Sequence, residues 1–173
     1  MNVDTLKARI RHVPDFPKPG ILFYDITTLL RDPAGFRLAI DSLAMPYADR
    51  QVELVVGIES RGFILGAAVA DRLGAGFTPI RKPGKLPSKT VKESFELEYG
   101  SDALEMHEDA IGRGQRVLVV DDVLATGGTA KAAASLVRRC GGDLLGLDFL
   151  IELVALNGRS KLEKESVYSV LTY

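Results

Sequence analysis

The segment that most constrains the fold spans residues 117–140, where an apolar run leads through two acidic residues and a small-residue loop into a helix-forming stretch. Residues 117–120 are all apolar and predict a short buried strand, which Asp121 and Asp122 follow directly. Residues 125–129 contain two glycines and two threonines, which predict a turn that opens the next helix. Because ligands bind at the carboxyl ends of strands in open α/β sheets, the segment predicts a sheet with a binding site at this point.

The loop at residues 125–129 has the chemistry of an anion site. Backbone N–H groups at the start of a helix lack partners within the helix, and the helix dipole favours negative charge there. The threonine hydroxyls add donors, and the carboxylates of Asp121 and Asp122 can accept hydrogen bonds from sugar hydroxyls. The segment therefore indicates a phosphorylated sugar. Taken alone, the loop also fits a plain turn with Thr129 as the helix N-cap.

Two common phosphate-binding motifs are absent from the sequence. Pro79 stands where a Walker A loop ending in Gly84 and Lys85 would need its first glycine. The sequence also has no complete G-x-G-x-x-G. These absences argue against an ordinary NTPase and against a dinucleotide-binding protein.

Composition and charge indicate a small globular enzyme. The 173 residues are 46% hydrophobic and 26% charged, which suits one domain, residues 1–173. We find no signal peptide and no apolar run long enough to span a membrane, so we expect a cytoplasmic location and no membrane partner. Cys140 is the only cysteine, which excludes internal disulfides and thiolate zinc clusters.

A basic stretch between residues 79 and 92 carries five Lys or Arg and no acidic residue. Its prolines and Gly84 make it a poor helix or strand, which favours a mobile loop that closes over a phosphate site. Aromatic residues do not interleave with the basic ones, and the net charge is only −1. We therefore do not expect a nucleic-acid partner.

Predicted strands and helices alternate along the chain, which indicates an α/β fold with a mostly parallel central sheet flanked by helices on both faces. The predicted helices are residues 33–44, 61–73, the stretch after 128, and 156–164. The predicted strands are residues 54–58, 77–81, 117–121, 144–153 and 167–173, with an antiparallel excursion at 94–99 and 104–107.

Five blocks of the sequence resemble the type I phosphoribosyltransferase family. Residues 117–129 resemble the motif with which that family binds 5-phosphoribosyl 1-diphosphate (PRPP). The other blocks are residues 16–26, 57–63, 81–87 and 97–100. The spacing of all five is similar to that in the branch of the family that uses adenine.

The resemblance implies a type I phosphoribosyltransferase fold with a small N-terminal hood (residues 1–32), and a flexible catalytic loop with an antiparallel excursion (residues 82–107). It implies a purine-salvage reaction in which adenine and PRPP give AMP and diphosphate. Mg²⁺ would be held mainly through PRPP and water. Arg81 resembles a residue that reaches into the neighbouring subunit's site, which implies a homodimer.

The resemblance also assigns roles to individual residues. Phe23 would stack on the base, the main chain of Leu22 and Tyr24 would read its edge, and Glu98 would orient it. The turn around Ser60 is expected to contain a cis peptide. The expected site is catalytic Glu98, Asp121 and Asp122; 5′-phosphate-binding Ala125, Thr126, Gly127, Gly128 and Thr129; diphosphate-binding Ser60, Arg61, Lys85 and Arg81; and base-binding Leu22, Phe23 and Tyr24, with no metal ligand from the protein.

Several alternatives remain open at this point. The family commonly has Arg where this chain has Tyr24, and residues 22–24 also fit an aromatic segment packed into the core. The region of Glu98 also fits an exposed strand edge. For the function, the alternatives are transfer to hypoxanthine, guanine or xanthine, and a non-catalytic regulator that senses PRPP. A regulator would be expected to lack Glu98 or the basic loop, and this chain has both.

Overall fold

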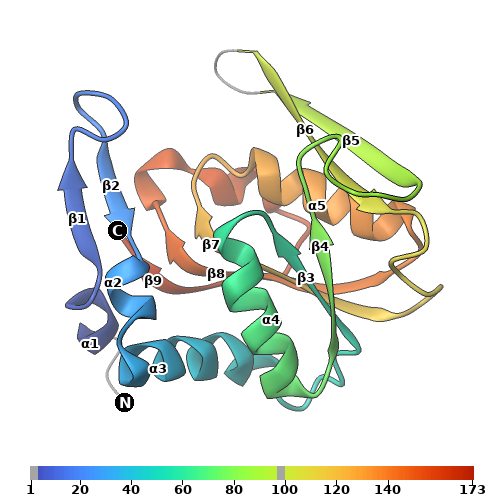
Figure 1. Cartoon of the computed structure of the whole chain (residues 1–173), viewed down its shortest axis with the longest axis horizontal. Coiled ribbons are helices and arrows are strands. Elements are labelled where there is room, and N and C mark those ends of the chain that lie inside the picture. The colour runs from blue at the N-terminus through green and yellow to red at the C-terminus, as the bar shows by residue number, and fades with distance from the viewer. Residues whose placement is uncertain (1–3, 97–99) are drawn as a thin grey trace.

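A five-stranded parallel sheet forms the centre of the molecule (Figure 1). The structure is a computed structural model that describes residues 4–96 and 100–173. The sheet confirms the predicted α/β class, and the strand that carries the acidic pair lies at its middle and continues two residues beyond Asp122. In spatial order the strands are β4 (Gly76–Ile80), β3 (Leu54–Ile58), β7 (Arg116–Leu124), β8 (Asp143–Glu152) and β9 (Val167–Thr172).

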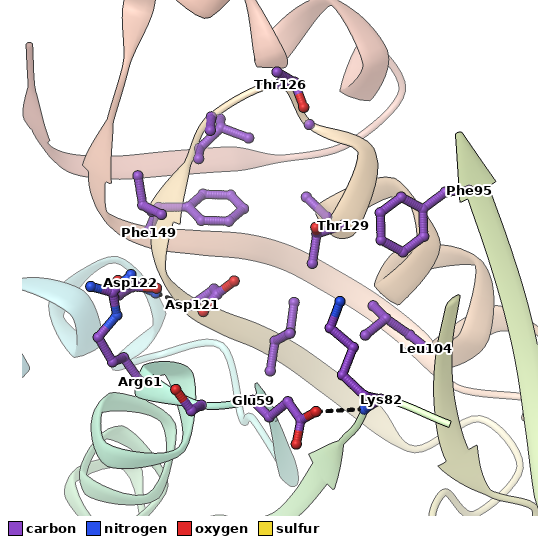
Figure 2. Close-up of a pocket in the computed structure, with 17 residues that line it drawn as sticks. Glu59, Arg61, Lys82, Phe95, Leu104, Asp121, Asp122, Thr126, Thr129 and Phe149 are labelled. Carbon is purple, nitrogen blue, oxygen red and sulfur yellow. Dashed lines mark hydrogen bonds and ion pairs between the residues drawn. The ribbon is translucent and has the colours of Figure 1, made fainter. Parts of the chain in front are cut away.

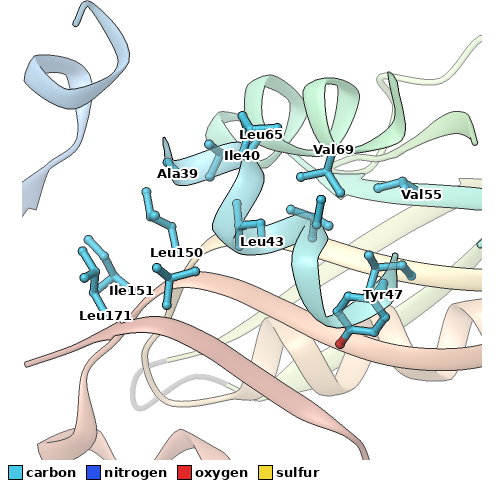
Figure 3. Packing of buried hydrophobic residues seen from close by; sticks show 14 of the residues in the cluster. Ala39, Ile40, Leu43, Tyr47, Val55, Leu65, Val69, Leu150, Ile151 and Leu171 are labelled. Carbon is cyan, nitrogen blue, oxygen red and sulfur yellow. The ribbon is translucent and has the colours of Figure 1, made fainter. Parts of the chain in front are cut away.

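Two hydrophobic cores lie on opposite faces of this sheet, because side chains alternate between the faces along each strand. On β7, Leu118 and Val120 belong to one core, whereas Val117 and Val119 belong to the other. The first core packs against α3 (Pro33–Ala44), the 3-10 turn η1 (Met45–Tyr47) that follows it, and α4 (Arg61–Leu73), as Figure 3 shows. The second packs against α5 (Gly128–Arg139).

Local signals explain where the first two long helices begin and end. The Asp32 side chain accepts a hydrogen bond from the Ala34 N–H, and Pro33 occupies the first turn, where its missing N–H costs nothing. Helix α4 ends at Gly74, which has a φ of 68°. Both helices match the predicted ranges.

The N-terminal residues form a separate layer beside the carboxyl ends of the strands (Figure 1). A two-stranded antiparallel ribbon projects from a base whose Leu6, Ile26 and Leu29 are fully buried in the first core. This layer contains α1 (Asp4–Lys7), β1 (Arg11–Pro14), β2 (Leu22–Asp25) and α2 (Thr27–Leu30).

The predicted antiparallel excursion is a hairpin of β5 (Thr90–Glu96) and β6 (Ser101–His107), which packs on α5. Arg139 on α5 donates to the Lys92 carbonyl oxygen and the Glu93 carboxylate. Predicted Glu98 lies outside the described residues. Within those residues, no helix is both long and apolar enough to cross a membrane.

One predicted helix was wrong. Residues 156–164 do not form a continuous α-helix but fall into two 3-10 turns, η2 (Val154–Leu156) and η3 (Gly158–Leu162). Asn157 adopts a left-handed conformation with a φ of 50°, which ends the first turn. Gly158 then brings its backbone against the carbonyl oxygen of Ala125, so tertiary contact overrides the local helical preference.

Candidate functional site

A cleft of about 310 Å³ opens where β3 and β7 end (Figure 2). Residues from the two strand ends, the start of α4, the loop before α5 and the hairpin surround it. Its lining residues are Ile58, Glu59, Ser60, Arg61, Lys82, Phe95, Leu104, Asp121, Asp122, Val123, Leu124, Ala125, Thr126, Gly127, Thr129, Ala130 and Phe149.

The acidic pair lies on the floor of this cleft. Asp121 and Asp122 are 8% and 6% exposed, and the Asp122 N–H donates to Asp121 Oδ1 at 2.9 Å. Burial raises the pKa of Asp121, and the Asp122 carboxylate raises it further. Burial also raises the pKa of Asp122, against the opposing effect of the Arg61 guanidinium. A ligand with hydroxyl donors would replace the solvation that both carboxylates lack.

The loop from Ala125 to Thr129 follows β7 and leads into α5, as predicted. Gly127 has a φ of 78°, in the region that favours glycine, and precedes the first turn of the helix. The backbone of Gly158 lies directly behind the loop: a Cβ added to Gly127 would stand 2.3 Å from the Gly158 oxygen. The loop backbone is thus supported from behind and open to the cleft in front.

Arg61 begins α4 and joins the acidic pair to the hood. Its Nε lies 2.8 Å from Asp122 Oδ2, and its guanidinium carbon lies 5.1 Å from the centroid of the Phe23 ring. The Glu59–Ser60 peptide just before it is cis, as the family resemblance implied. Ser60 and Arg61 therefore present a hydroxyl and a cation to the same cleft.

The Glu59 carboxylate forms hydrogen bonds with three basic residues that follow β4. It accepts them from Arg81 Nε at 3.1 Å, the Lys82 N–H at 2.8 Å and Lys85 Nζ at 3.1 Å. Burial raises the pKa of Glu59, but these donors outweigh that effect and lower it below its ordinary value. Arg81 and Lys85 are thereby held beside the cleft rather than among its lining residues.

Lys82 is a cleft residue that the sequence analysis did not assign. Figure 2 shows its ammonium in the cleft, across from the carboxylates, and the group pairs with Asp102 on the hairpin. The only sequence signal was its membership of the basic stretch. Phe95, Leu104 and Phe149, which give the cleft an apolar side, were also missed because each comes from a different element.

The structure brings together most but not all of the predicted site. Ser60, Arg61, both acidic residues and four of the five loop residues line the cleft, whereas Gly128 contacts Phe95 instead. The predicted base-binding residues Leu22, Phe23 and Tyr24 do not line it. Phe23 adjoins it through Arg61, while Tyr24 packs on the other side of the ribbon against His12 and Tyr173.

Known proteins resemble this chain over nearly its whole length. Residues 26–172 match the sequence profile of the phosphoribosyl transferase domain. The adenine phosphoribosyltransferase of Solibacter usitatus is 61% identical, with 97% of each chain covered. The crystal structure of the Rhodothermus marinus adenine phosphoribosyltransferase superposes with a TM-score of 0.95 at 55% identity, covering 99% of this chain and 98% of that one.

A more distant solved structure adds a bound ligand. The Saccharomyces cerevisiae adenine phosphoribosyltransferase, complexed with adenine and an imino-altritol bisphosphate, has a TM-score of 0.93 at 42% identity and covers 98% of both chains.

Proposed function

The chain belongs to the phosphoribosyltransferase family, and we propose that it transfers the 5-phosphoribosyl group of PRPP to adenine, giving AMP and diphosphate in purine salvage. The observation that carries this proposal is the composition of one cleft. A buried acidic pair, a glycine-containing loop at a helix start and the cations of Arg61 and Lys82 surround the same space. The adenine bound to the yeast relative supports adenine as the acceptor base.

Each part of PRPP has a matching part of the cleft. We assign the 5′-phosphate to the loop from Ala125 to Thr129, which lines the cleft at the start of α5, where backbone N–H groups lack partners within the helix. The ribose hydroxyls would donate to Asp121 and Asp122. Displacement at the anomeric carbon builds positive charge on the ribose ring, and the nearby carboxylates would stabilise it.

The diphosphate leaving group carries the negative charge that develops in this reaction. We assign it to Ser60, Arg61 and Lys82 in the cleft, with Lys85 available from the basic stretch of the same chain and Arg81, as the family resemblance implies, from a neighbouring subunit. In this structure Arg61 pairs with Asp122, and Lys82 pairs with Asp102. Phosphate oxygens would therefore displace these carboxylates from the two cations, or share the cations with them. Charge-assisted hydrogen bonds of this kind are among the strongest in proteins.

The base would lie between Phe23 and the ribose. We propose that Phe23 stacks on adenine, that the main chain of Leu22 and Tyr24 reads its edge, and that Glu98 orients it, as the family resemblance implies. Phe23 lies beside Arg61 at the edge of the cleft, which supports this assignment. Stacking would hold the ring in line with the anomeric carbon, so that N9 can attack it.

Magnesium would enter with the substrate. Mg²⁺ keeps several waters and takes phosphate oxygens readily, and within the described residues no group of three or more His, Cys, Asp or Glu could hold a metal. The acidic pair is the part of the cleft that could orient its waters. Once bound, the ion would neutralise charge on the diphosphate.

We further propose a homodimer and a cytoplasmic location. Arg81 packs over Phe63 and pairs with Glu59 outside the lining of its own cleft, which leaves it available to a neighbouring subunit. Ile64 and Phe77, on α4 and β4, are partly exposed and offer an apolar contact surface. Analytical ultracentrifugation should give twice the mass of one chain.

The proposed reaction predicts AMP formation from adenine alone. The purified protein would be incubated with PRPP and Mg²⁺ and given adenine, hypoxanthine, guanine or xanthine separately, with nucleotides resolved by chromatography. Nucleotide from an oxopurine instead would refute the assignment of the base while leaving the PRPP site intact. PRPP binding without product from any base would indicate a regulator.

Lys82 provides a second prediction. Lys82→Gln should raise the KM for PRPP about tenfold, because a charge-assisted contact to phosphate is lost, and should leave the KM for adenine unchanged. Asp102→Asn should have the opposite effect on the KM for PRPP, since it frees the Lys82 ammonium. Lys89→Gln is the matched control, because Lys89 belongs to the same basic stretch but does not line the cleft. Equal effects from Lys82→Gln and Lys89→Gln would contradict the assignment.

A further inference from the structure

The two faces of the β1–β2 ribbon have different partners. Neighbouring side chains on a strand point to opposite faces, and on β2 the Phe23 ring meets Arg61 at the cleft. The Tyr24 ring faces away and packs against two rings: His12, at a centroid distance of 5.1 Å, and the C-terminal Tyr173, at 4.1 Å. Figure 1 shows the C-terminus beside β2.

The backbone of Tyr173 is hydrogen-bonded to the end of the central sheet. Its N–H donates to the Glu152 carbonyl at 3.0 Å, and its carbonyl accepts from the Val154 N–H at 2.9 Å. The neighbouring Leu153 N–H donates to the carbonyl of Leu124, the last residue of β7. The Tyr173 ring is therefore held in a fixed relation to the strand that carries the acidic pair.

The ribbon depends on such outside contacts. An isolated two-stranded ribbon is marginally stable in water, and Phe16, Ile21 and Leu22 at its outer end are exposed. On the cleft side its ring contact is with Arg61, which also pairs with Asp122 and which we assign to the diphosphate. When diphosphate engages Arg61, the contacts of the ribbon with the Tyr173 ring stay in place: that of Tyr24 at 4.1 Å and that of His12 at 5.8 Å between ring centroids.

We propose that Tyr173 is a positioning residue for the base. Its ring holds the ribbon in place through Tyr24, so that the Phe23 ring lies at stacking distance from adenine. This inference rests on the proposed function. It also gives a role to the tyrosine at position 24, where the family commonly has arginine, because a ring stacks on Tyr173. The Tyr173 hydroxyl is buried and has no hydrogen-bond partner among the described residues, so the ring rather than the hydroxyl makes the contact.

Kinetics of three variants test the role of the ring. Tyr173→Ala should raise the KM for adenine about three- to tenfold, the amount expected for losing an aromatic pair, with the KM for PRPP unchanged. Tyr173→Phe should match the wild type. Tyr168→Ala is the matched control, because Tyr168 is half-buried like Tyr173 and lies on β9, the strand just before Tyr173, but away from the ribbon. This variant should have a lower melting temperature and an unchanged KM for adenine. An unchanged KM in Tyr173→Ala, or an equal rise in both KM values, overturns the proposal.

A second variant covers the case in which Tyr173→Ala fails to fold. Tyr24→Ala removes the partner ring from the projecting ribbon and should produce the same rise in the KM for adenine. Where both single variants fold, the rises in the double variant should be clearly less than additive, because both substitutions remove the same Tyr24–Tyr173 contact. Additive rises would overturn the proposal.

Hydrogen exchange separates this inference from the proposed function. Backbone amides of residues 11–13 and 22–25 should exchange faster in Tyr173→Ala than in wild type, and at the wild-type rate in Tyr168→Ala. Wild-type protein that makes no AMP refutes the proposed function, and the base-positioning role with it, whatever the exchange rates. Active wild type with unchanged exchange in Tyr173→Ala refutes the positioning role alone.

Discussion

Gly127→Ala is expected to lower kcat/KM for PRPP about a hundredfold while the protein stays folded. Alanine is strained at the φ of 78° found there, and its Cβ would stand 2.3 Å from the Gly158 oxygen. Because the obstacle is backbone rather than a flexible side chain, the phosphate loop must shift. A shift of about 1 Å in a group that positions substrate costs on the order of a hundredfold in rate.

Two further variants isolate the cause. Gly158→Ala disturbs the packing between the same two backbone segments, because its Cβ would stand 2.1 Å from the Ala125 oxygen. It should give the same loss of kcat/KM for PRPP. Gly74→Ala is the matched control: its φ is 68°, but nothing lies within 4 Å of the added Cβ. It should cost about 1 kcal/mol of stability with normal kinetics. Steady-state kinetics and thermal melting measure both effects. Normal kinetics in Gly127→Ala would show that the loop does not hold phosphate.

Asp148→Asn is expected to stabilise the protein by about 4 kcal/mol at pH 7, and by more at higher pH. Asp148 lies on β8 between Val120 and Tyr168 of the neighbouring strands. It is fully buried, and within residues 4–96 and 100–173 neither of its carboxylate oxygens has a hydrogen-bond partner. Burial raises its pKa to about 9, against the smaller opposing effect of the nearby Phe149 backbone. The folded protein therefore keeps a neutral acid in an apolar site, which an amide of the same shape can replace.

The direction of the pH effect follows from that raised pKa. The unfolded chain releases the Asp148 proton near pH 3.8, whereas the folded chain holds it up to about pH 9. The contribution of this group to stability is thus fully present below pH 3.8 and is lost as the pH rises through 9. Asparagine does not titrate, so its advantage over wild type should widen by roughly 1 kcal/mol per unit between pH 5 and 8.

Urea denaturation of both proteins at each pH measures this difference. The difference between the two proteins is the informative quantity, because Asp121 and Asp122 also have raised pKa values and are present in both. Asp143→Asn, at the exposed start of the same strand, is the matched control and should show no widening gap. A constant gap for Asp148→Asn would mean that Asp148 is ionised in the folded protein.

Much of the fold could be predicted from local signals. The predicted helix at 33–44 agrees with α3 because Asp32 caps it and Pro33 suits its first turn, and the helix at 61–73 ends at Gly74. The strand at 54–58 was predicted from its unbroken apolar run. The helix predicted at 156–164 failed because Asn157 and Gly158 fit their backbone to the phosphate loop, and no local pattern records that contact.

The candidate site likewise contains residues that could be predicted from the sequence and residues that could not. The cleft position of the acidic pair and of the loop at residues 125–129 could be predicted from the sequence because these residues are contiguous, within 121–129 of one strand, loop and helix. Lys82 could not, because its position in the cleft depends on β4 and on Asp102 across the hairpin.

The sequence alone thus determined the type and order of the main elements, the family and the composition of the loop that we propose binds phosphate, since these depend on residues that are neighbours in the chain. The tertiary structure decided three other features: Gly158 behind the loop, Tyr173 against Tyr24, and the burial of Asp148 without a partner. Each joins or encloses residues far apart in sequence. Burial and contact across such separations arise only when the sheet and its layers assemble, so no local pattern of residues could encode them.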